Sequence, residues 1–117
     1  MKILKSTFFL FFLFVIASFT FFHHGWANYD QTKVMDFTST IEESIYENPH
    51  VLVKVKHKGE IWTVFLAPIS RMSDRGVSGD AIKKGTEVRL VAYPHKTEKG
   101  EMRAERIFIE GKKYELR

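Results

Sequence analysis

The sequence predicts a mainly β fold, a small OB-like barrel of five to six strands with one short helical segment between strands 3 and 4, preceded by an N-terminal apolar helix. Three observations lead to this prediction. Apolar and polar residues alternate along several short segments, as they do in half-buried strands. Turn residues separate these segments. One stretch with helical start and stop residues follows the third segment, and this order favours an OB barrel over a small β-sandwich or an SH3-like barrel.

The first three strands are predicted over residues 34–47, 51–57 and 60–66. The first is rich in β-branched residues, and Pro49 ends it because proline lacks the amide donor of a strand. The second has valines on one face and lysines on the other. The lysine–glycine pair at 58–59 is a tight-turn signal, so the second and third strands are expected to form a hairpin.

The second half of the chain is predicted to contain a helical region and the remaining strands. Pro68 suits the first position of a helix, and Gly85 suits the end of the region. Alternation then predicts strands over residues 86–93 and 102–109, with a short final strand over 112–116.

The N-terminal residues indicate export. Lys2 and Lys5 precede an uncharged, mostly apolar run, which is the pattern of a secretory signal. The run is a little shorter than the roughly 20 residues that a spanning helix needs. We therefore expect a signal peptide or N-terminal membrane anchor over residues 1–22, a tether over 23–33 and the OB-like domain over 34–117. The domain is expected in the periplasm or another extracytoplasmic space, secreted across or anchored in the inner membrane.

Several classes of catalytic and structural site are excluded by the residues present. The chain has no cysteine, which excludes disulfides, thiolate metal ligands and a cysteine nucleophile. It contains no GxSxG elbow, no HExxH pair and no lysine-bearing phosphate loop. We therefore expect no enzymatic activity.

Nucleic acid is not an expected partner, although OB barrels often bind it. Such binding needs aromatic platforms beside a basic groove. The formal charge of +4 includes the two leader lysines, so the remainder carries +2, with both signs interspersed. Trp62 alternates with Val64 and Leu66 on the apolar side of its strand and is expected in the core. Export also separates the chain from cytoplasmic nucleic acid, and contact with the membrane is expected only through an uncleaved N-terminal segment.

His23 and His24 are the candidate metal ligands. A signal-peptidase cut after Thr20 would place His23 third in the mature chain. A free amine, two backbone amides and that imidazole form a square-planar nitrogen set, which suits copper(II) or nickel(II). Copper is therefore the cofactor considered, and a copper or other transition-metal-binding periplasmic protein is the alternative function.

A candidate ligand-binding rim comprises Asn48, His50, Tyr93 and His95. Each histidine follows a proline, in the predicted loops between strands 1 and 2 and between strands 4 and 5. Those two loops border the usual ligand face of an OB barrel. The alternative is that both Pro-His pairs only end strands, and strand directions do not require the two loops to meet.

Several short motifs together resemble an uncharacterised family of short exported bacterial proteins, a domain of unknown function. The motifs are HHGW at 23–26 followed by YD at 29–30, ENPH at 47–50, LAP at 66–68 with SRM at 70–72, YPH at 93–95 and MRAERI at 102–107. The resemblance implies a small domain that faces the periplasm or the exterior, and it implies no reaction. We therefore expect an extracytoplasmic binding or accessory module whose partner is a small ligand or a protein.

Overall fold

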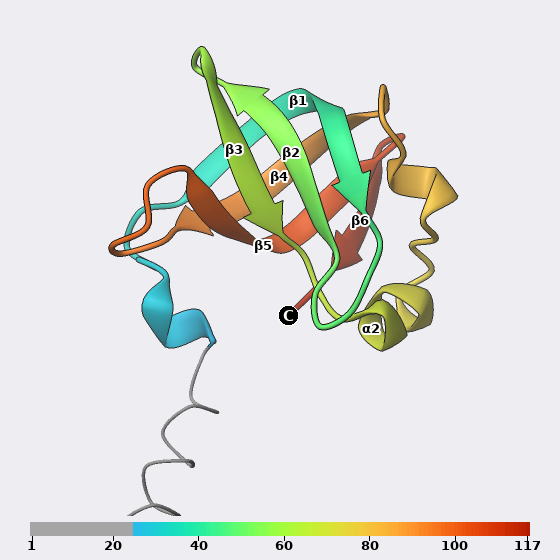
Figure 1. Ribbon diagram of the computed structural model, residues 1–117. Coiled ribbons are helices and arrows are strands. Elements are labelled where there is room, and N and C mark those ends of the chain that lie inside the picture. Colours follow the sequence, from blue (N-terminus) through green and yellow to red (C-terminus); the bar gives the residue numbers. More distant parts are fainter. Residues whose placement is uncertain (1–24) are drawn as a thin grey trace, which may run out of the picture.

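The computed structural model describes residues 25–117, so the predicted leader, His23 and His24 lie outside the described residues. Within that range the chain is mainly β, with a closed five-strand barrel and one outer strand (Figure 1). This confirms the predicted mainly β barrel. The strands are β1 (Met35–Ile45), β2 (Leu52–His57), β3 (Glu60–Phe65), β4 (Glu87–Pro94), β5 (Glu101–Ile109) and β6 (Lys112–Glu115).

A parallel pairing between β3 and β5 closes the barrel. The other neighbours pair antiparallel in the order β3-β2-β1-β4-β5-β6. The N-terminal part of β5 pairs with β3 over Thr63–Phe65, and its C-terminal part pairs with β6. β6 is therefore added outside the closed barrel and has no second partner among the described strands.

The predicted hairpin between β2 and β3 is present. Lys58 and Gly59 both have positive φ, 51° and 80°. Two successive residues in this region form the turn whose twist matches that of the flanking strands. Glycine takes this conformation without steric cost, which explains its place at 59.

The helical segments among the described residues are short: η1 (Trp26–Asn28), α2 (Ile69–Asp74) and η2 (Asp80–Ile82). The last two lie between β3 and β4, where the sequence predicts helix. Met72 and Ile82 are fully buried and pack into the barrel core. None of the helices in the described part of the chain is long and apolar enough to cross a membrane.

The core follows the predicted alternation on most strands. Val64 and Leu66 are fully buried, whereas Trp62, on the same face of the strand, is partly buried and packs against the core. On β4, the alternating residues Val88 and Leu90 are buried in the core. Tyr93, on the outer face, is also buried at 9% exposure, because another part of the chain covers it.

That covering segment is the one predicted as a tether. Tyr29 forms a β-bridge with His95. The backbone N–H of Asp30 donates to the carbonyl of Pro94 at 2.8 Å, and that of Lys96 donates to Asn28 at 2.9 Å. Residues 25–30 thus pack against the barrel, while the predicted division of the chain into leader, tether and domain stays a prediction.

Candidate functional site

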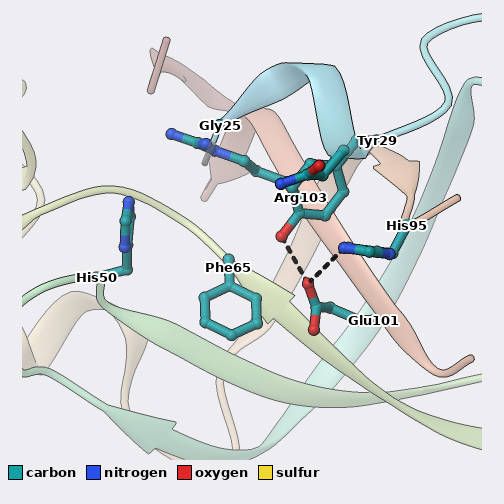
Figure 2. Close-up of a pocket in the computed structure, with 8 residues that line it drawn as sticks. Gly25, Tyr29, His50, Phe65, His95, Glu101 and Arg103 are labelled. Atoms are coloured by element: carbon teal, nitrogen blue, oxygen red, sulfur yellow. Dashed lines mark hydrogen bonds and ion pairs between the residues drawn. The ribbon is translucent and has the colours of Figure 1, made fainter. Parts of the chain in front are cut away.

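An open cavity of about 230 Å³ lies beside the β4–β5 loop, where five parts of the chain meet (Figure 2). They are the segment around η1, the β1–β2 loop, the end of β3, the β4–β5 loop and the start of β5. The lining residues are Gly25, Asn28, Tyr29, His50, Phe65, His95, Glu101 and Arg103.

The structure brings together two of the four rim residues suggested by the sequence. His50 and His95 line the same cavity, from the β1–β2 and β4–β5 loops. Figure 2 shows His50 on one side of the cavity and His95 with Tyr29 and Glu101 on the other. A ligand-binding role for these residues stays a prediction.

The other two rim residues, Asn48 and Tyr93, do not line the cavity. Oδ1 of Asn48 accepts a hydrogen bond from the backbone N–H of Ile69 at 3.2 Å, at the start of α2. The Tyr93 hydroxyl donates to Glu105 at 2.8 Å, and its ring meets the ring of Trp26 edge to face. In the structure, both side chains hold local elements in place.

A cluster of Tyr29, Glu101 and His95 forms one wall of the cavity. The Tyr29 hydroxyl donates a hydrogen bond to Oε2 of Glu101 at 2.7 Å, and Nε2 of His95 lies 3.9 Å from the same oxygen. Burial, together with the hydrogen bond to Glu101, raises the pKa of Tyr29. The phenol is therefore a stable donor, and Glu101 is held in one orientation.

Backbone amides orient the ring of His95. Its Nδ1 accepts hydrogen bonds from the backbone N–H of Thr97 at 3.1 Å and of Glu98 at 3.0 Å. An imidazole nitrogen that accepts carries no proton, so the neutral ring carries its proton on Nε2, which is the nitrogen nearer Glu101. The loop thus presents a fixed N–H toward this wall.

Arg103 contributes a half-buried guanidinium to the cavity. Its Cζ lies 4.4 Å from the ring centre of Trp26, and the Cζ of Arg117 also lies 4.4 Å from that ring. The Nε of Arg103 is buried without a hydrogen-bond partner among residues 25–117. Burial lowers the pKa of Arg103, and the nearby Arg71 and Arg117 lower it further, while Tyr29 opposes them.

His50 lies on the side of the cavity opposite the wall that Tyr29, Glu101 and His95 form. Its ring meets Phe65 edge to face, with centroids 6.3 Å apart. Burial lowers the pKa of His50, and the charges of Arg103 and Arg71 add to that effect. His50 is therefore held in the neutral form near pH 7.

Sequence reasoning missed three of the cavity's polar residues, Tyr29, Glu101 and Arg103. Tyr29 lies in the predicted tether, and only the docking of residues 25–30 brings it to the barrel. Glu101 and Arg103 reach the cavity because the start of β5 pairs with the end of β3. The YD and MRAERI motifs contain Tyr29 and Arg103 and were the available signal for those two.

No group of three or more histidine, aspartate or glutamate side chains among residues 25–117 is placed to hold a metal ion. The candidate ligands His23 and His24 lie outside the described residues. The copper hypothesis therefore stays a prediction that depends on those two residues.

Comparison with known proteins gives one result on the family. No curated protein matches the chain. A family model described as "Family of unknown function (DUF6152)" matches residues 12–103. The match covers most of the chain, from within the predicted leader to Arg103 in the cavity, and the chain therefore belongs to this DUF6152 family of unknown function.

Proposed function

We propose that this chain is a small extracytoplasmic binding module, without enzymatic activity of its own, that holds a small ligand in the cavity between the β1–β2 and β4–β5 loops. The observation that carries the proposal is the convergence on this cavity of His50, His95, Glu101 and Arg103 beside the ring of Phe65. A concave site with an apolar wall and a few converging polar groups is the usual form of a small-molecule site.

The barrel connectivity supports this choice of site. Around the closed barrel the strands follow the order β1-β2-β3-β5-β4, with helical segments between β3 and β4. We assign this arrangement to the OB type, in which the loops between strands 1 and 2 and between strands 4 and 5 border the ligand face. His50 and His95 come from those two loops.

The size of the cavity restricts the ligand. Its volume of about 230 Å³ lies below the roughly 300–1,000 Å³ of sites for drug-sized molecules. The ligand is therefore a small molecule, or one small group of a larger molecule that extends into solvent through the open side.

Binding is favoured over catalysis by the engagement of the polar groups. Tyr29 and His95 both face Glu101, and the second nitrogen of His95 is occupied by backbone amides. A general acid or base needs a position from which it reaches the substrate proton. Here the hydroxyl of Tyr29 and the two ring nitrogens of His95 instead hold the wall of the cavity in place.

The extracytoplasmic location is proposed from the sequence. Lys2 and Lys5 precede an uncharged apolar run, as in secretory signals and N-terminal anchors. The described domain follows directly after that run.

Nuclear magnetic resonance of the full-length, nitrogen-15-labelled chain in an uncharged detergent tests the binding function. A library of small polar molecules is added while the backbone amide signals are followed. We expect at least one compound to shift the amides of Gly25, His50 and Glu101 in a saturable way, and to leave those of Lys58 and Gly59 in the distant hairpin turn unchanged. If every saturable shift maps outside the cavity, or none is found, the proposed site is wrong.

A further inference from the structure

Arg103 has no carboxylate partner among the described residues, and unlike Arg71, which donates a hydrogen bond to the carbonyl of Leu116, it has no hydrogen-bond acceptor there either. Arg89 pairs with Asp36 at 2.7 Å, Arg106 with Glu115 at 2.9 Å and Arg117 with Glu105 at 3.6 Å. No ion pair or hydrogen bond joins the guanidinium of Arg103 to another residue in the described range 25–117. Residues 1–24 contain no aspartate and no glutamate, so the rest of the chain supplies no carboxylate side chain either.

A guanidinium in this position is costly unless something compensates its charge. Arg103 is half-buried, and a charged group that leaves water loses hydration that must be replaced by a partner. Stacking on Trp26 satisfies one face of the guanidinium plane but none of its N–H donors. The donors at the edge of the plane remain for a group that enters the cavity.

The charges around Arg103 select an anion. Arg71 and Arg117 lie near enough to lower its pKa, and they make the potential at this side of the cavity positive. Glu101, the acidic residue of the lining, is held on the opposite wall by Tyr29 and is directed toward His95. A negative group beside Arg103 therefore meets little repulsion.

The number and type of donors favour a carboxylate over a phosphate. Among the described residues, Arg103 is the one arginine or lysine in the cavity lining, and it matches a single negative charge. A guanidinium edge binds a planar carboxylate through two parallel hydrogen bonds. The ring of Phe65 lies beside this position and offers an apolar surface to the carbon atoms of the same molecule.

The main chain at Gly25 lies beside the guanidinium of Arg103. A Cβ at that position would come no nearer than 4.0 Å to the Nη1 atom of Arg103. The main chain at Gly25 thus borders the guanidinium without a side chain that would cover it. The contact between Trp26 and the guanidinium holds η1 against Arg103.

From these observations we infer that the cavity binds a small monocarboxylate, with the carboxylate on the guanidinium of Arg103 and the apolar part against Phe65. The inference depends on the proposed binding function and names its ligand class.

The test compares pairs of probes that differ only in charge. Propionate is compared with propionamide, and benzoate with benzamide, by titration of the labelled full-length chain in uncharged detergent at constant ionic strength. Inorganic phosphate and butylammonium are titrated in parallel. We expect at least one carboxylate to shift the amides of Gly25, His50 and Glu101 saturably, with its amide counterpart at least about tenfold weaker, because a hydrogen-bonded charge pair is lost.

Variants of Arg103 assign the effect to that residue. Arg103→Gln is expected to weaken carboxylate binding at least about tenfold, and Arg103→Lys to weaken it less, because an ammonium keeps the charge but not the planar fork. The matched control is Arg89→Gln, which removes a guanidinium with its own carboxylate partner from outside the cavity lining. It is expected to leave the affinity within twofold of the parent.

The outcomes separate this inference from the function on which it depends. Equal affinity for a carboxylate and its amide, or tighter binding of phosphate or butylammonium, overturns the carboxylate assignment. If no carboxylate shifts the cavity amides while another compound from the library does, the assignment also fails and the binding site stands. If no compound of any class shifts them, both fail. Because the comparison of acid with amide uses the parent chain, it decides the matter even if both Arg103 variants fail to fold.

Discussion

The hydroxyl of Tyr29 donates a 2.7 Å hydrogen bond to Oε2 of Glu101, at the first position of β5. This bond connects the segment that precedes the barrel to the strand that closes it. The same cavity wall therefore depends on two parts of the chain that are 72 positions apart. Variants that release the segment are expected to change the cavity while they leave the barrel intact.

Tyr29→Phe removes this hydrogen bond and keeps the ring. We expect the free energy of unfolding to fall by about 1 kcal/mol, the usual net contribution of such a bond when it is partly exposed. Urea unfolding followed by circular dichroism measures the change. Tyr114→Phe is the control, because the structure shows no hydrogen bond from the Tyr114 hydroxyl to a described residue. Equal losses in the two variants would contradict the assigned role of Tyr29.

Arg103→Gln is expected to raise the pKa of His50. The charge of Arg103 contributes to holding that pKa below its ordinary value of about 6.5, so its removal makes protonation easier. Proton titration of the imidazole signals reads the pKa directly. His57 is the internal control, because burial and Lys58 lower its pKa without Arg103. A shift of His57 as large as that of His50 would indicate a general change of the fold.

The depressed pKa of His50 also gives the sign of its effect on stability. As pH falls below about 6.5, the unfolded chain binds a proton at His50 before the folded chain does. Protonation therefore favours unfolding, and stability falls over that range. His50→Gln is expected to show a smaller fall in melting temperature between pH 7 and 5 than the parent, and a fall of the same size would show that His50 does not contribute.

Trp26→Ala is expected to release residues 25–30 from the barrel. Trp26 stacks between the guanidinium groups of Arg103 and Arg117, and cation–π contacts contribute about 0.5–1 kcal/mol each at exposed sites. Hydrogen exchange should accelerate at the amides of Asp30 and Lys96, which bond across this junction. Amides within β2 should keep their protection.

Phe108→Ala is the matched control for that experiment. Phe108 lies under the guanidinium of Arg89 at 4.5 Å, so the variant removes a cation–π contact away from the cavity. It is expected to leave exchange at Asp30 and Lys96 unchanged. Acceleration in both variants would indicate that the segment responds to overall stability and not to Trp26.

Trp62→Ala tests the contribution of the partly buried tryptophan to the core. We expect a loss of about 2–4 kcal/mol, somewhat below the range for a fully buried tryptophan. Thermal or urea unfolding measures it. Ile61→Ala, at the neighbouring position with 51% exposure, should change stability by no more than about 0.5 kcal/mol. A Trp62 variant as stable as the parent would show that the ring is not needed for packing and would make a ligand contact at Trp62 worth testing.

Export is tested by a reporter fused after Arg117 that is active only outside the cytoplasm. The basic start at Lys2 and Lys5 with the apolar run predicts activity. Replacement of both lysines by glutamate should reduce export of the fusion. A parent fusion that is inactive, although the protein is present in the cytoplasm, would remove the proposed location and reopen nucleic acid as a partner.

Local sequence by itself determined the strands and the turns of the barrel. The alternation at Val53 and Val55 and the turn at Lys58 and Gly59 each depend on residues close together in the chain, so a short window contains their cause. The helical segments between β3 and β4 were predicted for the same reason, from their start and stop residues. The Pro-His loops were also recognised, because proline ends a strand wherever it lies.

The cavity was decided only by the tertiary structure. The pairing of β3 with β5 brings Arg103 beside Phe65, and the docking of η1 brings Tyr29 to Glu101. Neither contact has a local cause, since each joins residues separated by more than thirty positions, and such closures depend on the packing of the whole barrel. The unpaired state of Arg103 is a property of the same kind: a sequence shows that an arginine is present, and only the fold shows which carboxylates lie out of its reach.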